Sequence, residues 1–195
     1  MAFTMPAFAT AKLNLILLSL LLLISTSSVA AKFSVDSAVI TKIGNGYSLE
    51  ADINYSLTPR VKEAIANGVP IVFVQELEII QALPLLGQFW QWQNTLWSTS
   101  LRYELRYHAL TNQYVVNDLD TDHHRSFISL EAALDALGTI EAFTLPPEHM
   151  TDTDNLHIYL RTSLDLLELP TPMRPGALLS SKWQLGSPWT EATWQ

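Results

Sequence analysis

The chain has no cysteine among its 195 residues, and this absence removes several kinds of chemistry. Disulfides, thiolate nucleophiles and cysteine-ligated metals are excluded, and so is a lipid anchor attached through a cysteine. An exported protein without disulfides is held together by its core alone. About 165 residues remain after the N-terminal segment described below, which is enough for one domain with a core.

Positive charge is also scarce. The chain has 11 Lys and Arg residues against 19 Asp and Glu residues, a net charge of −8. Residues 1–30 contain one Lys and no acid, so residues 31–195 carry 10 basic and 19 acidic residues, a net charge of −9. This balance argues against nucleic acid or an anionic membrane surface as a partner. The motifs of phosphate loops, zinc proteases, dinucleotide sites and nucleophile-elbow hydrolases are absent from the sequence as well.

The first 30 residues have the pattern of a secretory signal peptide. Lys12 is their single charge, and residues 13–24 form an apolar run with two polar interruptions. Ser28 and Ala30 occupy the −3 and −1 positions of a small-x-small cleavage site, which predicts cleavage between Ala30 and Ala31. The run is shorter than the about 20 residues of a membrane span. We expect a periplasmic or otherwise exported protein without stable membrane insertion after cleavage; an uncleaved tether in the inner membrane is the alternative.

Strict alternation over residues 101–109 is the clearest folding signal in the chain. Leucine, tyrosine and alanine side chains alternate there with arginine, glutamate and histidine side chains. Successive residues of a strand point to opposite faces, so we expect Tyr107 on a buried face and His108 on an exposed face. Residues 110–113 interrupt the pattern and residues 114–116 resume it, which predicts a hairpin.

Shorter pieces of the chain show similar patterns. Further strands are expected at residues 33–43, 47–57, 69–80, 140–145 and 156–164. Thr58-Pro59 and Ser129 are N-cap signals that begin short helices. We expect residues 81–94 to form a loop or helical turn, and the proline-rich tail to be irregular, with its tryptophans packed on the body.

These elements predict a mainly β fold, with α+β as the marginal classification. We expect an antiparallel, sandwich-like single domain over residues 31–195, with two or three short helices, because a second sheet would bury the apolar face of each strand. A single sheet covered on one face by the helices is the alternative.

Three aspartates suggest a metal site. Asp118, Asp120 and Asp122 have the 1-3-5 spacing of a calcium loop. The pattern fails at position 6, where His123 replaces the required Gly, and at position 12, where Ser129 replaces Glu. A solvated loop is therefore the favoured interpretation, and we expect no cofactor.

Aromatic residues are crowded before the alternating strand. Trp90, Trp92 and Trp97 are candidates for a ligand groove or a partner surface, although core packing is the favoured interpretation because large aromatics are mostly buried. His108 is a further candidate, because we place it on the polar face of its strand. We identify no catalytic residue.

Several segments together resemble a known family. The segment 107–114, Tyr-His-Ala-Leu-Thr-Asn-Gln-Tyr, is the most specific, and four others agree with it: residues 68–71, 129–134, 164–174 and 181–189. These motifs resemble domain-of-unknown-function family 4390, a family of exported proteobacterial proteins, over nearly all of residues 31–195. One departure is that residues 89–92 keep aromatics but lack the arginine usual in the family.

The resemblance implies no known activity, cofactor or catalytic residue. It implies an accessory role in envelope signalling, with an envelope or membrane sensor protein as partner. The amphipathic β scaffold, the six tryptophans and the lack of a recognisable catalytic motif predict a non-catalytic periplasmic interaction module. The alternative is an envelope hydrolase or a small-ligand-binding protein that uses the polar groups near His108, Asp118 and His123.

Overall fold

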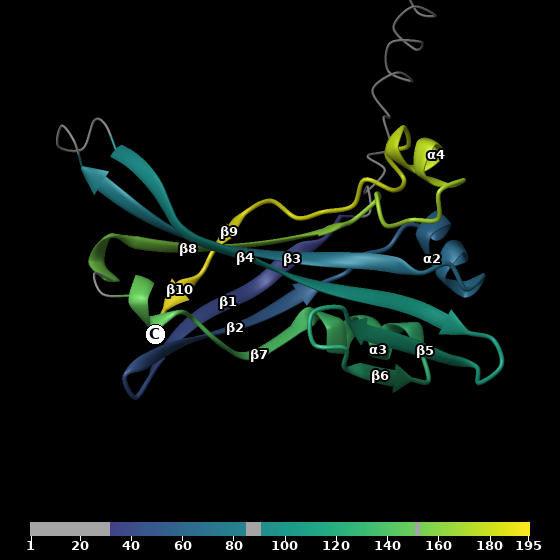
Figure 1. Ribbon diagram of the computed structural model, residues 1–195, viewed down its shortest axis with the longest axis horizontal. Helices are drawn as coiled ribbons and strands as arrows, with labels where there is room; N and C mark the ends of the chain where they lie inside the picture. Colours follow the sequence, from purple (N-terminus) through teal and green to yellow (C-terminus); the bar gives the residue numbers. More distant parts are fainter. Residues whose placement is uncertain (1–31, 85–90, 151–152) are drawn as a thin grey trace, which may run out of the picture. The chain divides into compact units, whose positions relative to one another are not determined.

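The structure is a computed structural model that describes residues 32–84, 91–150 and 153–195. The predicted signal peptide and its cleavage site fall on residues 1–31, outside this description. Two sheets of the described residues share one core (Figure 1). Sheet A has, in spatial order, β10 (Thr193–Trp194), β1 (Ser34–Ile43), β2 (Gly46–Asn54) and β7 (Thr139–Thr144). Sheet B has β6 (His124–Phe127), β5 (Gln113–Asp118), β4 (Gln91–His108), β3 (Ile71–Pro84), β8 (Leu156–Leu164) and β9 (Thr190–Glu191).

The described strands pair antiparallel with one exception, the parallel pair β1 and β10. The described helices are all short: α2 (Pro59–Ala66), α3 (Leu130–Gly138), α4 (Arg174–Leu178) and the 3-10 turns η1 (Pro147–His149) and η2 (Thr153–Asn155). The predicted mainly β, sandwich-like fold with short helices is confirmed. None of the helices in the described ranges is long and apolar enough to cross a membrane.

The two longer helices begin at the predicted caps. The side-chain oxygen of Thr58 accepts a hydrogen bond from the N–H of Val61 at 3.3 Å, and that of Ser129 accepts one from Ala132 at 3.1 Å. Each bond satisfies a backbone donor that has no partner inside the helix. Gly138, the last residue of α3, packs so closely on β2 that a Cβ there would overlap the carbonyl oxygen of Ile53.

The β3–β4 hairpin is longer than the sequence predicts. Residues 81–84 continue β3 and residues 91–94 belong to β4, so the expected loop or helical turn over 81–94 is wrong at both ends. The ladder continues to the pair Pro84 and Gln91, past a register shift after Ile79. Proline is compatible with this position because it ends the strand.

The predicted faces of β4 are clearest at its middle. Leu105 is fully buried. Tyr107, near the strand end, is half-buried, and its ring centroid lies 4.9 Å from that of Tyr114 while its hydroxyl donates to Asn112. His108 is half-buried as well. The difference in burial between the two faces of β4 is therefore smaller near the β4–β5 turn than at Leu105, because fewer core residues cover the end of the strand.

The core joins the two sheets through aromatic rings. The ring centroid of Tyr55, just after β2, lies 4.9 Å from that of Phe33 and 5.0 Å from that of Phe73 on β3. All three side chains are buried. Aromatic pairs at such distances and steep interplanar angles add to the burial of apolar area.

The C-terminal segment is more regular than predicted, because it contains α4, β9 and β10. β9 extends sheet B beside β8, and β10 extends sheet A beside β1, so the tail passes from one sheet to the other (Figure 1). Ala192, between them, is buried. Trp183 is buried, and the ring of Trp189 lies 4.5 Å from the guanidinium of Arg161. The tail therefore closes one margin of the sandwich.

Candidate functional site

The tryptophan candidates are described only in part. Trp90 lies outside the described residues. Trp92 pairs with Leu83 in the β3–β4 ladder, and its side chain lies outside the described part. Trp97 is half-buried, and its ring centroid lies 6.5 Å from that of Phe143 on β7. Trp97 therefore packs between the two sheets.

The polar candidates of the hydrolase alternative do not converge. His108 pairs with Gln113 at one end of the β4–β5 ladder, and Asp118 pairs with Tyr103 at the other end. Five residues of extended strand separate the two ends, a distance of about 16 Å. His123 accompanies Asp118, since its carbonyl accepts the N–H of Asp118 at 2.8 Å. An acid–base set needs its groups within hydrogen-bond reach, and these residues do not provide one.

Two of the three aspartates accept backbone hydrogen bonds, Asp118 at the end of β5 and Asp120 in the loop that follows. The carboxylate of Asp118 accepts hydrogen bonds from the N–H groups of Asp120 and Thr121, and that of Asp120 accepts one from the N–H of Arg102. Partial burial opposes ionisation of Asp118, but hydrogen bonds from the Thr121 side chain and these backbone groups outweigh it and hold its pKa below the ordinary value. Within the described ranges, no three His, Asp or Glu side chains are grouped closely enough to hold a metal ion.

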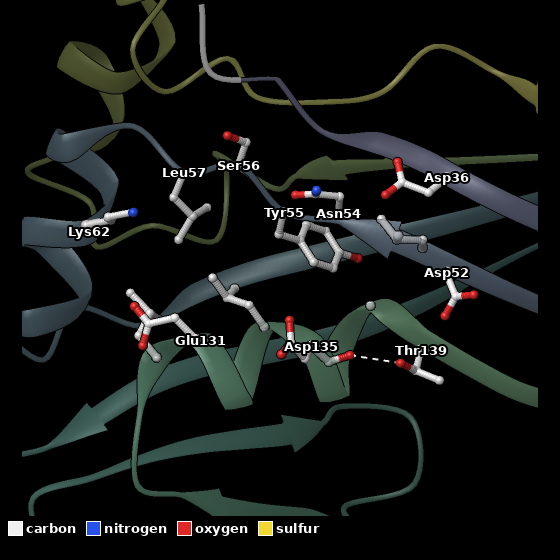
Figure 2. Close-up of a pocket in the computed structure, with 14 residues that line it drawn as sticks. Asp36, Asp52, Asn54, Tyr55, Ser56, Leu57, Lys62, Glu131, Asp135 and Thr139 are labelled. Atoms are coloured by element: carbon white, nitrogen blue, oxygen red, sulfur yellow. Dashed lines mark hydrogen bonds between the residues drawn. The ribbon is translucent and has the colours of Figure 1, made fainter.

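A recess of about 510 Å³ lies instead among β1, β2, α2 and α3 (Figure 2). Its polar lining comes from all four elements and their flanking residues: Asp36, Asp52, Asn54, Ser56, Lys62, Glu131, Asp135 and Thr139. Its apolar lining comes from β2, the segment that follows it and α3: Ile53, Tyr55, Leu57, Leu130 and Leu134. The volume is within the range of ligand pockets, about 300–1,000 Å³.

A buried hydrogen-bond chain holds Tyr55 beside the recess. The Gln75 side-chain amide donates to the Tyr55 hydroxyl at 3.0 Å and to the carbonyl of Leu137 in α3 at 2.8 Å. The Thr162 hydroxyl, 3.1 Å from that of Tyr55, donates its hydrogen to Val74, so Tyr55 is the donor to Thr162. Burial raises the pKa of Tyr55 to about 12. The hydroxyl therefore stays protonated at neutral pH and links β3 to β8, and the Gln75 amide extends this chain to α3.

Tyr55→Phe removes both the acceptor for Gln75 and the donor to Thr162. We expect it to lower the free energy of unfolding by about 1–3 kcal/mol, because buried polar groups lose their partners. Tyr47→Phe is the matched control, since within the described residues the Tyr47 hydroxyl has no hydrogen bond, and it should cost less than about 0.5 kcal/mol. Urea unfolding of both variants measures the difference, and equal losses would contradict the role of the hydroxyl.

Negative charge gathers around the recess without matching positive charge. Among the described residues, its four carboxylates form no ion pair, and Lys62 is the one cation in the lining. Sheet B differs, because several of its charged side chains form ion pairs. Arg161 donates two hydrogen bonds to Glu76, at 2.6 and 2.9 Å, and Arg102 lies 2.7 Å from Glu168. The unpaired carboxylates therefore make the electrostatic potential around the recess negative.

β7 forms an edge of sheet A next to this recess. It pairs with β2 on one side, and no strand in the described part of the chain pairs with its other side. The N–H of Leu145 donates to Tyr47 at 2.9 Å, so the N–H of the preceding Thr144 points toward the free edge. A register shift opposite Glu50 marks a bulge in the strand, where Ala142 has a φ of 49°.

Two grooves follow β7. The groove on the outer face of sheet A has a volume of about 410 Å³ and shares Asp52 and Thr139 with the recess. Glu50 and Glu141 add two more carboxylates to its lining. The recess and this groove therefore form one acidic surface along the edge strand.

The second groove lies on the opposite side of β7. It has a volume of about 560 Å³ and is lined by Leu101 and Tyr103 of β4 and by Phe143 of β7. These three side chains are half-buried. Sheet B continues past this point with β5 and β6, which α3 contacts (Figure 1).

Sequence reasoning did not find this surface because its parts come from distant segments. Glu50 and Asp52 were recognisable as the polar face of an alternating strand, and α3 was predicted. β7 pairs with β2 and forms the edge of sheet A because of the topology of the fold. No short sequence motif predicts this position.

The described residues form a β-sandwich in which no described strand pairs with the outer side of β7. Over residues 30–193 the chain matches the family described as Domain of unknown function (DUF4390), and it belongs to that family. The resemblance found in the sequence is thereby confirmed. No curated protein and no solved structure matches the chain.

Proposed function

We propose that residues 31–195 form an exported, non-catalytic interaction module. It binds a partner protein, and a strand of the partner pairs with the free edge of β7. The free edge of β7 carries this proposal. An unpaired strand presents backbone donors and acceptors that a second strand satisfies, and such strand addition is a common mode of peptide recognition.

The separation of the residues named for the hydrolase alternative supports a binding role. His108 lies far from Asp118, and the Tyr55 hydroxyl is engaged in the core. An enzyme of the hydrolase type needs a nucleophile, a base and an oxyanion site within reach of one reacting atom. The grooves beside β7 instead offer charge on one face and apolar surface on the other.

The proposed partner is an envelope or membrane sensor protein. Export is supported by the signal-peptide pattern of residues 1–30, and signalling by the resemblance described above. The net charge of −9 over residues 31–195 argues for a protein partner with a basic contact surface.

Photo-cross-linking from β7 tests the proposal in living cells of the organism that makes the protein. A benzophenone amino acid at position 141 is expected to form one defined cross-linked product. Thr144→Pro removes the outward N–H, and we expect it to reduce the yield about five- to tenfold, since one hydrogen bond contributes about 1 kcal/mol. Proline is tolerated at a strand edge, so the thermal midpoint should change little.

Position 100, on the outer face of sheet B, provides the matched control. Ser100 is exposed and lies on β4, away from the edge of sheet A. The same product from positions 100 and 141, or a yield that Thr144→Pro leaves unchanged, would overturn the proposal.

A further inference from the structure

The outer face of sheet A presents carboxylates to any strand that pairs with β7. Glu50, Asp52 and Glu141 are exposed, and within the described residues none of them has an ion pair. The groove that they line contains no Lys or Arg side chain. A strand added to β7 would lie about 10 Å from β2, a gap that a lysine and a glutamate side chain span together.

The inner face presents apolar surface to the same strand. Leu101, Tyr103 and Phe143 are half-buried beside β7 and would gain cover from a strand at this edge. Arg125 and Glu141 also line this groove, Glu141 being shared with the groove on the outer face, and the guanidinium of Arg125 is already engaged. It donates to the carbonyl of Ala136 at 3.2 Å and lies 5.9 Å from the ring centroid of Phe127.

Neighbouring residues of a strand point to opposite faces. The acidic outer face of sheet A and the apolar groove beside β4 would therefore contact alternate residues of the partner strand. We infer that the partner contributes an extended segment in which basic and apolar side chains alternate, the basic ones over Glu50, Asp52 and Glu141 and the apolar ones toward β4. This inference rests on the proposed function, and it adds the chemistry of the partner segment.

The length of the paired region is limited. The bulge at residues 141–142 interrupts β7 on one side, and Pro146 follows it closely on the other. The new ladder is therefore no longer than the six residues of β7, Thr139–Thr144, with Asp52 opposite Thr139 at one end and Ser48 opposite Thr144 at the other. Side-chain contacts on the two faces then contribute much of the specificity, with a strong dependence on salt.

Three fluorescein-labelled ten-residue peptides test the inference on the full purified protein by fluorescence anisotropy. The first alternates Lys and Val, the second alternates Glu and Val, and the third has five Lys followed by five Val. We expect the Lys-Val peptide to bind at least about tenfold more tightly than either of the others, and to weaken as salt is raised. The third peptide, the block peptide, has the same composition and charge as the Lys-Val peptide but does not alternate, so it tests whether alternation itself matters.

Variants of the protein locate the charge effect. Glu50→Gln combined with Glu141→Gln is expected to weaken binding of the Lys-Val peptide by about tenfold, whereas Glu78→Gln, on the outer face of sheet B, leaves it unchanged. Equal binding of the Lys-Val and Glu-Val peptides, or of the alternating and block peptides, would overturn the inference. If the peptides bind equally but Thr144→Pro still lowers the cross-linking yield from position 141, the proposed function stands and the inferred chemistry of the partner segment is wrong. If Thr144→Pro leaves that yield unchanged as well, the proposed function and the inference are both wrong.

Discussion

Gly138→Ala is expected to lower the free energy of unfolding by about 3 kcal/mol, a large effect for one methyl group. The α3 backbone at Gly138 packs on β2, and an added Cβ would overlap the carbonyl oxygen of Ile53. Both partners are backbone segments inside the core, so relief requires α3 to move away from sheet A. Such a shift would also disturb the hydrogen bond from Gln75 to Leu137 in the same helix.

Gly176→Ala is the matched control for this change. Gly176 is also a helical glycine, in α4, and a Cβ there meets no atom within 4 Å. Alanine favours helix over glycine by about 0.8–1.0 kcal/mol, so this variant should be neutral or slightly more stable. Chemical unfolding of the two variants measures the contrast. A Gly138→Ala protein as stable as the parent would show that α3 does not pack on β2 as described.

Trp183→Ala is expected to cost about 3–5 kcal/mol, the range for truncating a buried large aromatic. Trp183 is 5% exposed and belongs to the common core. The preceding residue, Lys182, accepts a hydrogen bond at its carbonyl from the hydroxyl of Thr58, the N-cap of α2. The Trp183 side chain and this hydrogen bond together hold the C-terminal segment against α2. Truncation of Trp183 should therefore also destabilise the pairing of β9 and β10.

Trp194→Ala is the control for Trp183→Ala, because it also removes a tryptophan from the C-terminal segment but not one in the core. Trp194 is 40% exposed and packs edge-on against Tyr47, with ring centroids 5.6 Å apart. Its truncation should cost less than about 1.5 kcal/mol. Thermal unfolding distinguishes the two variants, and similar losses would mean that the tail is held by its last strand rather than by Trp183.

The elements that the sequence predicts correctly are those with a local cause. β8 shows why, because its residues are buried and half-buried in strict alternation, the pattern read directly from the sequence. The caps at Thr58 and Ser129 are equally local, since each side chain bonds a backbone N–H three residues ahead. Periodicity and capping act over a few residues, so a single sequence contains them.

The features that the sequence does not reveal depend on contacts between distant segments. Pro84 looks like a break, yet β3 continues to it because β4 provides a partner along its whole length. β10 pairs parallel with β1, and no local pattern marks so short a strand. The acidic surface has the same character. Asp52 was recognisable as an exposed residue, but its proximity to α3 and to the edge strand β7 follows from the packing of the sheets.

Strand addition at β7 is tested most directly by locating the partner residues that the cross-linker reaches. Mass spectrometry of the products from positions 141 and 144 would identify the attached residues of the partner. We expect them to fall within one extended segment of a single protein, about one to four residues apart, because adjacent strands lie about 4.8 Å from each other. Attachment sites scattered over several segments or several proteins would contradict strand addition at this edge.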